Sequence, residues 1–509
     1  MLSQVISATL EGVSGLIVEV EVDIAPGLPS FATVGLPEGA VRESKDRVKA
    51  AIKNCGYDFP ARKITVNLAP ADVRKAGTGY DLPIAIGILS ATGVLKGTKH
   101  KEYLLIGELS LDGRLRPVPG VLPIAITASK SAITGIIVPA ENAQEAAIVE
   151  GLDVIAVNTL FEVVEFLEGL KVIEPVVSSF LHDRPASCQY DIDLSEVKGQ
   201  SQAKRALEIA AAGGHNLLFE GPPGSGKTMI ARRLPTILPD LSLEEAIETT
   251  SVYSVAGLTD KYQGIIRQRP FRAPHHTISD AGLIGGGQVP RPGEVSLAHN
   301  GVLFLDELAE YRKNVLEGLR QPLEDGMVTI SRASSSLTFP AEIILVAAVN
   351  PCPCGYHGDP AHNCTCSAVQ VLKYKSRISG PLVDRIDMYV EVSAVPFSDL
   401  TSQTSGESSK VIKERVVAAR KIQQKRFQRH KHVYCNSQMG SKAIAKFCAL
   451  DSTCQQLIEN AVNRLGLSAR AYNRIQKIAR TIADLDNEED IKSSHVAEAI
   501  QYRRLDRSA

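Results

Sequence analysis

A short apolar run that leads into a glycine-rich loop constrains this chain more than any other feature of its sequence. The run from Asn216 to Glu220 is followed at once by Gly-Pro-Pro-Gly-Ser-Gly-Lys-Thr over 221–228, and then by a helical pattern. This matches G-x-x-x-x-G-K-[ST] in the strand–loop–helix context that the motif requires. It predicts a doubly wound α/β fold in which backbone N–H groups of the loop bind phosphate.

The loop supplies the first residues of a predicted nucleotide site. We expect Lys227 to reach the β and γ phosphates of ATP and the Thr228 hydroxyl to bind Mg²⁺. A glycine-rich turn without a ligand is the alternative, and the flanking strand and helix argue against it. The other loop residues expected to contact ATP are Gly221, Pro222, Pro223, Gly224, Ser225 and Gly226.

Two further apolar runs end in polar side chains. The run Val302 to Leu305 precedes Asp306 and Glu307, and the run Ile343 to Val349 precedes Asn350. Ligands of a doubly wound sheet lie at the carboxyl ends of its strands. We therefore expect the Asp to hold Mg²⁺, the Glu to activate the attacking water and the Asn to contact the γ-phosphate or that water. Surface acids and a turn Asn are the alternatives.

The length of 509 residues suits two to four domains. Strand-like and helical runs alternate in the first third of the chain, Pro and Ser interrupt the pattern after it, and helical periodicity dominates the end. The predicted parts are an α/β or α+β domain over 1–170, a linker over 171–189, a doubly wound ATPase domain over 190–397 and an all-helical lid over 398–509.

Charge and hydropathy exclude several classes of protein. The net charge of -1 gives no overall attraction to nucleic acid, so any DNA contact must come from local patches. The basic run from Lys410 to Lys431 suits a helix that faces phosphates, or equally a solvated or intersubunit surface. The first residues lack a basic segment and no apolar run reaches the roughly 20 residues of a membrane helix, so we expect a cytoplasmic protein without membrane contact.

Segments 292–301, 323–333 and 379–387 resemble the magnesium-chelatase and MCM-helicase branch of AAA+ ATPases. The resemblance implies a helix-2 insert, a hairpin before the Asn350 strand, and a homo-oligomeric ring that we expect to be a hexamer. It further implies that Arg385 is an arginine finger that acts in the neighbouring subunit's site. Arg470 looks like the lid arginine, with Arg474 as the second choice. An ion pair with a surface acid is the alternative for either role.

The N-terminal segments 66–83 and 106–118 are similar to the proteolytic domain of Lon. Lon uses a Ser-Lys pair, and the matching positions here are Gly79 and Leu122, so the resemblance implies a catalytically empty Lon fold. The order of an inactive Lon-like domain, a chelatase-type ATPase and a helical lid resembles the ComM/YifB family over essentially the whole chain.

Membership in that family would imply an ATP- and Mg²⁺-dependent DNA motor. Such a motor drives branch migration or unwinding in homologous recombination, in this case of incoming DNA during natural transformation. A magnesium-chelatase motor subunit is the first alternative, although such subunits lack the Lon-like part. An ATP-driven protease or protein remodeller is the second, and the missing Ser-Lys pair argues against proteolysis.

Two short β-like arms around a polar turn, 327–332 and 337–339, predict a hairpin. Resemblance to MCM-type motors places this hairpin in the ring channel, with Arg332 on the phosphates of branched or single-stranded DNA. The insert 285–291 offers Arg291 as a second cation. A motor that acts on any sequence should bind phosphate and not bases. The alternative is that Arg332 pairs with Glu324 or Asp325.

Cys and His side chains are concentrated in two further places. Two C-x-C pairs separated by a short loop could supply four thiolates to a tetrahedral Zn²⁺. A reduced-thiol loop and a mixed Cys-His site are the alternatives. No partner is predicted for the adjacent pair His275 and His276, for which loop packing is expected. The cysteines are Cys352, Cys354, Cys364 and Cys366, and the neighbouring histidines are His357 and His362.

Overall fold

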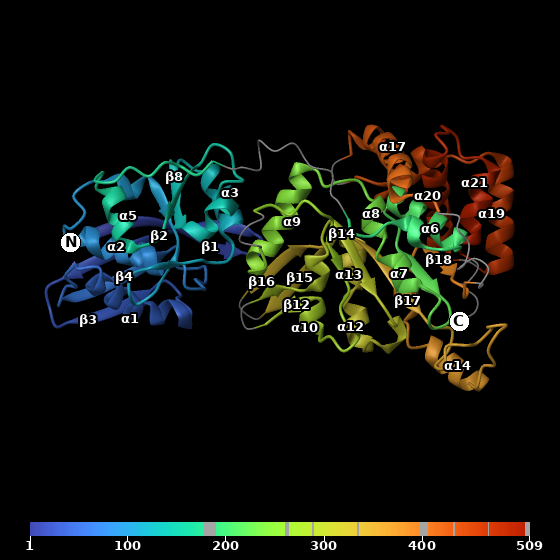
Figure 1. Ribbon diagram of the computed structural model, residues 1–509, viewed down its shortest axis with the longest axis horizontal. Helices are drawn as coiled ribbons and strands as arrows, with labels where there is room; N and C mark the ends of the chain where they lie inside the picture. The colour runs from blue at the N-terminus through green and yellow to red at the C-terminus, as the bar shows by residue number, and fades with distance from the viewer. Residues whose placement is uncertain are drawn as a thin grey trace.

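The computed structural model describes residues 1–177, 190–259, 264–287, 290–332, 335–395, 406–430, 433–466 and 468–503, without the side chains of Arg332 and Ser335. Figure 1 shows these residues as three parts in a row: an N-terminal sheet with its helices, a second sheet with its helices, and a C-terminal group of helices. Most of the predicted linker 171–189 and the predicted boundary at 397 lie outside the described residues.

The N-terminal part is a mixed sheet with helices on both faces. Val5 lies in a core with helices α1, α2 and α5, whereas Ala8 lies in a second core with helices α3 and α4. Residues three apart on one strand face opposite sides, so both faces of the sheet are buried. The helices are α1 (Gly39–Asn54), α2 (Asp81–Ala91), α3 (Val121–Ser129), α4 (Ala143–Ala146) and α5 (Leu160–Leu167).

The seven strands of this sheet lie in the order β3-β4-β2-β1-β5-β8-β9. Strands β1, β2 and β4 pair antiparallel, and the remaining pairs are parallel. The strands are β1 (Leu2–Glu11), β2 (Ser14–Ala25), β3 (Ser30–Val34), β4 (Lys63–Ala69), β5 (Tyr103–Leu105), β8 (Gly135–Pro139) and β9 (Asp153–Val157); β6 (Glu108–Leu109) and β7 (Leu115–Arg116) form a separate small hairpin.

The second sheet is the predicted doubly wound parallel sheet. Its order is β11-β14-β17-β10-β18, and every pair is parallel. Strand β10 comes first along the chain but lies between the last two strands, so the strand order reverses beside it. Such a switch point is where open α/β sheets bind ligands. The strands are β10 (Leu217–Glu220), β11 (Phe271–Arg272), β14 (Gly301–Leu305), β17 (Ile343–Val349) and β18 (Met388–Glu391).

Short helices and two hairpins surround this sheet. The hairpin predicted near 327–339 is present, with Arg332 opposite Ser335 next to the turn. Its strands are β15 (Met327–Arg332) and β16 (Ser335–Pro340), and the insert forms β12 (Gly285–Gly286) and β13 (Arg291–Pro292). The helices are α6 (Ser201–Gly213), α7 (Lys227–Ala231), α8 (Leu234–Ile237), α9 (Leu243–Ala256), α10 (Asp280–Leu283), α11 (Glu294–Leu297), α12 (Lys313–Gly318), α13 (Arg320–Asp325), α14 (Ala368–Lys375) and α15 (Gly380–Val383).

The C-terminal helices do not have a core of their own. Ile475 and Ile478 belong to the same buried cluster as Leu217 and Val346 of the second sheet. One apolar core therefore joins these helices to the sheet that carries the glycine-rich loop. The helices are α17 (Ser409–Phe427), α18 (Ser441–Phe447), α19 (Ser452–Leu465), α20 (Ala469–Leu485) and α21 (Ser493–Gln501). In the described part of the chain, no helix is both long and apolar enough to cross a membrane.

Candidate functional site

Lys227 lies at the centre of the loop between β10 and α7. Its side chain is buried, and its ammonium donates hydrogen bonds to the carbonyl oxygens of Gly221 (2.7 Å) and Pro222 (2.9 Å) and to Oδ1 of Asn350 (3.2 Å). Burial lowers the pKa of this lysine, while the carboxylates of Asp306, Glu307 and Glu220 act in the opposite direction. The structure thus brings Lys227 and Asn350 together, as their positions after adjacent strands predict.

Two glycines give the loop the shape that phosphate binding requires. Gly224 has φ +76° and Gly226 has φ +89°, a region that side-chain-bearing residues rarely adopt. No heavy atom of another described segment lies within 4 Å of a Cβ placed at either position. The backbone here is open to a ligand and bent into a concave turn. The loop residues therefore fit a polyphosphate chain.

Thr228 and Asp306 supply paired oxygen atoms beside the lysine. The Thr228 hydroxyl donates to Oδ2 of Asp306 at 2.6 Å, and Oδ1 of Asp306 accepts from the backbone N–H of Glu307 at 3.0 Å. A hydroxyl and a carboxylate at the end of buried strands are the ligands expected of a Mg²⁺ site in P-loop proteins. The residues present fit Mg²⁺ bound together with a nucleotide.

Glu307 has a strained backbone and an unexpected partner. Its φ is +51°, which is uncommon for a residue with a side chain and is concentrated at functional sites. Oε2 of Glu307 lies 3.4 Å from Nδ1 of His276, whose ring lies tilted against that of His275 with 4.1 Å between the centroids. Only loop packing was expected for these histidines. The contact follows from the parallel pairing of β11 with β14, which places the loop after 272 beside the residues after 305, and a strand as short as β11 leaves no signal in the sequence.

The two predicted arginines outside the loop have different surroundings. Arg385 is largely buried, forms an ion pair with Glu324 of its own chain and donates to the Pro381 carbonyl at 2.7 Å. Arg470 on α20 is 63% exposed and lies 3.7 Å from Asp384. Of these two, Arg470 is therefore accessible to a ligand, whereas Arg385 would have to leave Glu324 to act elsewhere.

Arg474, the second choice for the lid arginine, takes part in a buried network instead. It lies 3.3 Å from Asp387 and donates to the Ile386 carbonyl at 2.7 Å. Asp387 also accepts from the backbone N–H of Asn216, and the hydrogen bond from His215 together with the charge of Arg474 keeps the pKa of Asp387 below its usual range despite burial. This network joins α20 to strand β18 and the start of β10. Its contacts give Arg474 a structural role.

The basic residues considered for DNA contact fall into two groups. Arg291 is exposed on the insert, and the side chain of Arg332 lies outside the described residues. On α17, Arg415 pairs with Glu208 and Glu407, and Arg426 pairs with Asp484, so these cations hold the helix against its neighbours. Exposed cations do remain on α17, at Lys410, Lys421 and Lys425, and just after it at Arg429, while Lys431 lies outside the described residues.

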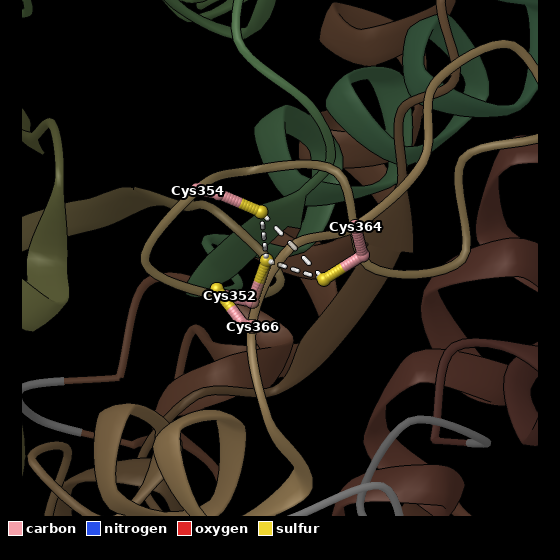
Figure 2. A group of neighbouring side chains, drawn as sticks. All are labelled: Cys352, Cys354, Cys364 and Cys366. Atoms are coloured by element: carbon pink, nitrogen blue, oxygen red, sulfur yellow. Dashed lines mark hydrogen bonds between the residues drawn. The ribbon is translucent and has the colours of Figure 1, made fainter.

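The four clustered cysteines face one another in the loop between β17 and α14, as Figure 2 shows. The Sγ of Cys352 lies 3.3 Å from that of Cys354 and 3.7 Å from that of Cys364, and the latter two are 3.6 Å apart. All four sulfur atoms, including that of Cys366, lie within 4.8 Å of one another. A tetrahedral Zn–S₄ site with bonds of about 2.3 Å has S···S edges of about 3.8 Å.

Backbone groups also prepare this cluster for a cation. Hydrogen bonds from the backbone N–H groups of Tyr356 and Thr365 lower the pKa of the Cys354 thiol, which favours the metal-binding thiolate. Burial and hydrogen bonds to the neighbouring thiols raise the pKa of Cys364 and Cys366. The Nδ1 atom of His362 lies 3.2 Å from Oδ2 of Asp359, so this ring pairs with a carboxylate and not with the sulfur atoms. The donor set that fits a metal is therefore the four cysteines, and not a mixed Cys-His set.

The positions that match the Lon dyad hold no nucleophile or base. A Cβ at Gly79 would lie 2.9 Å from Cγ1 of Ile106, so a serine there would displace that side chain. Leu122 is fully buried in a cluster that includes Ala246 of α9 and Ile265. Leu122 therefore forms part of the contact between the N-terminal sheet domain and the second sheet domain.

Glu145 completes this contact between the two domains. Its Oε1 accepts from the backbone N–H of Leu122 at 3.0 Å and from the hydroxyl of Ser254 on α9. Burial raises the pKa of Glu145, and its hydrogen bonds oppose the shift. The backbone N–H of Gly120 donates to the Ser254 carbonyl at 3.0 Å. Polar and apolar contacts thus fix α3 against α9.

Three family models together match most of the chain. "Magnesium chelatase, subunit ChlI" matches residues 193–400, "Subunit ChlI of Mg-chelatase" matches 20–142, and "Magnesium chelatase, subunit ChlI C-terminal" matches 406–503. The first of these covers the glycine-rich loop, both acidic residues after β14 and the cysteine cluster.

Individual relatives extend over nearly the full length. The YifB protein of Escherichia coli (strain K12) is 47% identical over 498 residues, which are 97% of this chain and 96% of that protein. The "Competence protein ComM" of Haemophilus influenzae is 46% identical over 507 residues, or 99% of this chain and 98% of that protein. "Lon protease 2" of Bacillus subtilis (strain 168) is 29% identical over 161 residues, 28% of this chain and 26% of that protein.

Proposed function

Because the chain belongs to the ComM/YifB family of magnesium-chelatase-like proteins, we propose that it is an ATPase that binds Mg–ATP in the loop 221–228. One observation carries this proposal: Lys227, Thr228, Asp306 and Asn350 make direct hydrogen bonds at the carboxyl ends of three adjacent parallel strands. This is the switch point of the sheet, where the fold places its ligands.

The proposed roles follow from the chemistry of each side chain. Lys227 binds the β and γ phosphates, and Thr228 and Asp306 hold Mg²⁺, which bridges the phosphates and neutralises charge as it develops. Glu307 orients and deprotonates the attacking water, and its half-exposed carboxylate is free to reach a ligand. Asn350 orients the γ-phosphate or the water, because its amide already contacts the lysine.

We place these residues in a homo-oligomeric ring, with a hexamer as the expected form. Arg385 is proposed as the arginine finger for the neighbouring subunit, and Arg470 as the lid arginine. The exposure of Arg470 and the structural contacts of Arg474 support the choice between the two lid candidates.

The proposed work of the ring is movement on DNA. A cytoplasmic motor of this kind would drive branch migration of branched or single-stranded DNA in recombination, as during natural transformation. The support is the near full-length similarity to a protein named for competence, together with the hairpin β15–β16 and the exposed Arg291 on the insert. The absence of a nucleophile and base at Gly79 and Leu122 argues against proteolysis.

A second candidate is a motor that powers metal insertion into a porphyrin. The descriptions of the three family models favour it, since all of them carry the magnesium chelatase name. The two functions predict different activators. A DNA motor should hydrolyse ATP faster with forked or four-way DNA and should displace a strand, whereas a chelatase motor should respond to porphyrin. Stimulation by porphyrin and not by DNA would reject the DNA motor.

The hairpin and the insert give a more specific prediction. Arg332→Ala should keep basal ATPase and assembly but lose at least about tenfold of DNA-stimulated turnover, because one phosphate contact per subunit is lost around the ring. Arg291→Ala should show a milder loss. Arg42→Ala, which removes an exposed Arg of α1, is the matched control. Strand displacement measured at several salt concentrations checks this, and full activity of Arg332→Ala at moderate salt would contradict it.

For the cysteine cluster we propose one structural Zn²⁺ per chain. The near-tetrahedral sulfur spacing supports this donor set. Elemental analysis of protein purified without chelators should give roughly one zinc per chain, and the paired substitution Cys364→Ser with Cys366→Ser should remove it. Cys55→Ser, which lies in the N-terminal domain, is the control. Metal-free wild-type protein with unchanged thermal stability would contradict the site.

A further inference from the structure

The cysteine loop starts beside the nucleotide site. Strand β17 ends at Val349, and the next residue, Asn350, contacts Lys227 at 3.2 Å. Cys352 follows two residues later, and its side chain is fully buried. A metal held by Cys352 would therefore fix the chain immediately after a residue that contacts the central lysine of the glycine-rich loop.

The loop also packs directly on the glycine-rich loop. Gly355 has φ +88°, and a Cβ there would lie 2.5 Å from Cδ and 2.6 Å from Cγ of Pro223. The backbone N–H of Gly355 donates to the Cys352 carbonyl at 3.0 Å, which closes a tight turn around the first two cysteines. The turn that carries two of the four thiols thus lies in contact with the Pro223 ring, and a residue with a Cβ would separate them.

The far end of the loop returns to the same place. Cys366 precedes the Ser367 cap of α14, and Lys375 at the end of that helix lies 3.6 Å from Glu220. Glu220 is the last residue of β10 and directly precedes the glycine-rich loop. Both side chains of this ion pair are less than a fifth exposed. The segment 351–367 is therefore joined to the glycine-rich loop at its start through Asn350 and, after its end, through α14 to Glu220.

Between these ends, the described segment contains no helix or strand. A connection longer than roughly 12–15 residues without secondary structure is uncommon unless it is functional. The four sulfur atoms and the contact between the rings of Tyr356 and His362 join its two halves, so a metal on the sulfur atoms would fix its shape. Through Pro223 and Glu220, that shape bears on the turn that binds phosphate.

We propose that the metal-bound cysteine loop is a clamp that holds the glycine-rich loop in its phosphate-binding form, so that metal affinity and nucleotide affinity are coupled. The proposal rests on the ATP and zinc sites proposed above. Coupling is reciprocal: if metal raises nucleotide affinity by a given factor, nucleotide raises metal affinity by the same factor. Because the clamp acts through contact with Pro223, removal of the proline ring should remove the coupling.

The test measures both halves of this cycle on the full-length protein. Binding of a fluorescent ADP analogue is titrated with saturating Mg²⁺, once on zinc-loaded protein and once after a zinc-selective chelator. Zinc affinity is measured by chelator competition with and without ADP. We expect zinc removal to weaken ADP binding about tenfold and ADP to tighten zinc binding by the same factor. Re-addition of Zn²⁺ should restore ADP affinity.

The variant Pro223→Ala distinguishes the clamp from a general loss of structure. It leaves all four thiols in place, so the zinc content should stay at the wild-type value. ADP binding should be weaker with zinc present, and zinc removal should then change it less than about twofold, since coupled groups are non-additive. The control Cys55→Ser should keep the full wild-type coupling.

Each failure has its own signature. Equal ADP affinity with and without zinc in the wild-type protein overturns the clamp but leaves both sites standing. Undiminished coupling in Pro223→Ala overturns the contact as its route. A chain that contains no zinc overturns the clamp together with the metal site. If stripped protein unfolds, ADP would raise zinc affinity through folding alone, and the zinc-loaded Pro223→Ala protein decides: it should bind ADP more weakly than zinc-loaded wild type, and equal affinity overturns the clamp. If zinc-loaded wild-type protein does not bind ADP, the proposed nucleotide site itself is rejected.

Discussion

Glu307→Gln is expected to bind ATP with near wild-type affinity and to hydrolyse it at least about a hundredfold more slowly, since a positioned general base contributes about 10²–10⁴-fold. The amide keeps the shape of the side chain but cannot accept a proton. The site keeps its other contacts, because Thr228 hydrogen-bonds to Asp306 and Lys227 hydrogen-bonds to Asn350, and neither bond uses the Glu307 carboxylate. Single-turnover hydrolysis and equilibrium nucleotide binding measure the two effects separately.

Lys227→Ala should show the opposite pattern. Its ammonium is the cation at the centre of the loop, so its loss should weaken nucleotide binding by about tenfold or more before any chemistry takes place. Glu307→Ala serves as a second check that the loss in Glu307→Gln comes from the carboxylate. If Lys227→Ala and Glu307→Gln bind ATP with equal affinity, and Glu307→Gln also has near-normal turnover, the assignment of the site is rejected.

Local sequence patterns were enough to predict the three central strands of the second sheet and the polar residues that follow them. The expected apolar runs ending at Leu305 and Val349 are strands β14 and β17, and the loop 221–228 follows β10. These elements are buried on both faces, so they appear as continuous apolar runs that need no tertiary information. The polar residues after them were predictable because parallel strands present their carboxyl ends on one edge.

Each contact that local patterns failed to predict joins segments that lie far apart in the sequence. The approach of His276 to Glu307 depends on the pairing of β11 with β14, and β11 is too short to show any periodicity. The burial of Leu122 against α9 depends on how two domains dock. The helical C-terminal part was predicted, but the core that it shares with the sheet was not. An amphipathic pattern shows which face of a helix is buried, but it does not show which element packs against that face.

The packing of α20 against the sheet domain bears on how nucleotide state could reach the lid. Ile475 of α20 and Leu217 of β10 belong to one buried cluster, and Arg474 on the same helix binds the network around Asp387. Close-packed interiors transmit strain. We therefore expect a displacement of β10 to be transmitted to α20, the helix that carries the exposed Arg470.

Arg385→Ala is expected to lower turnover by about 10³-fold or more while nucleotide binding to its own chain changes little. An arginine finger stabilises charge that develops on the transferred phosphate, and such residues are worth 10³–10⁵ in turnover. In this chain Arg385 is paired with Glu324, so it must leave that partner to act in the neighbouring subunit. Steady-state turnover and equilibrium nucleotide binding of the variant test this directly.

Glu324→Gln separates the finger from a merely structural arginine. The guanidinium of Arg385 is largely buried, and its Nε has no hydrogen-bond acceptor among the described residues. If Arg385 only holds α13 to its surroundings, Arg385→Ala and Glu324→Gln should therefore lower thermal stability to a similar extent. If Arg385 acts in trans, Glu324→Gln should keep or raise turnover. Rings assembled from Arg385→Ala and Lys227→Ala chains should then regain hydrolysis, since an intact loop in one subunit meets an intact finger from the next. Full activity of Arg385→Ala alone would show that this arginine is not the finger.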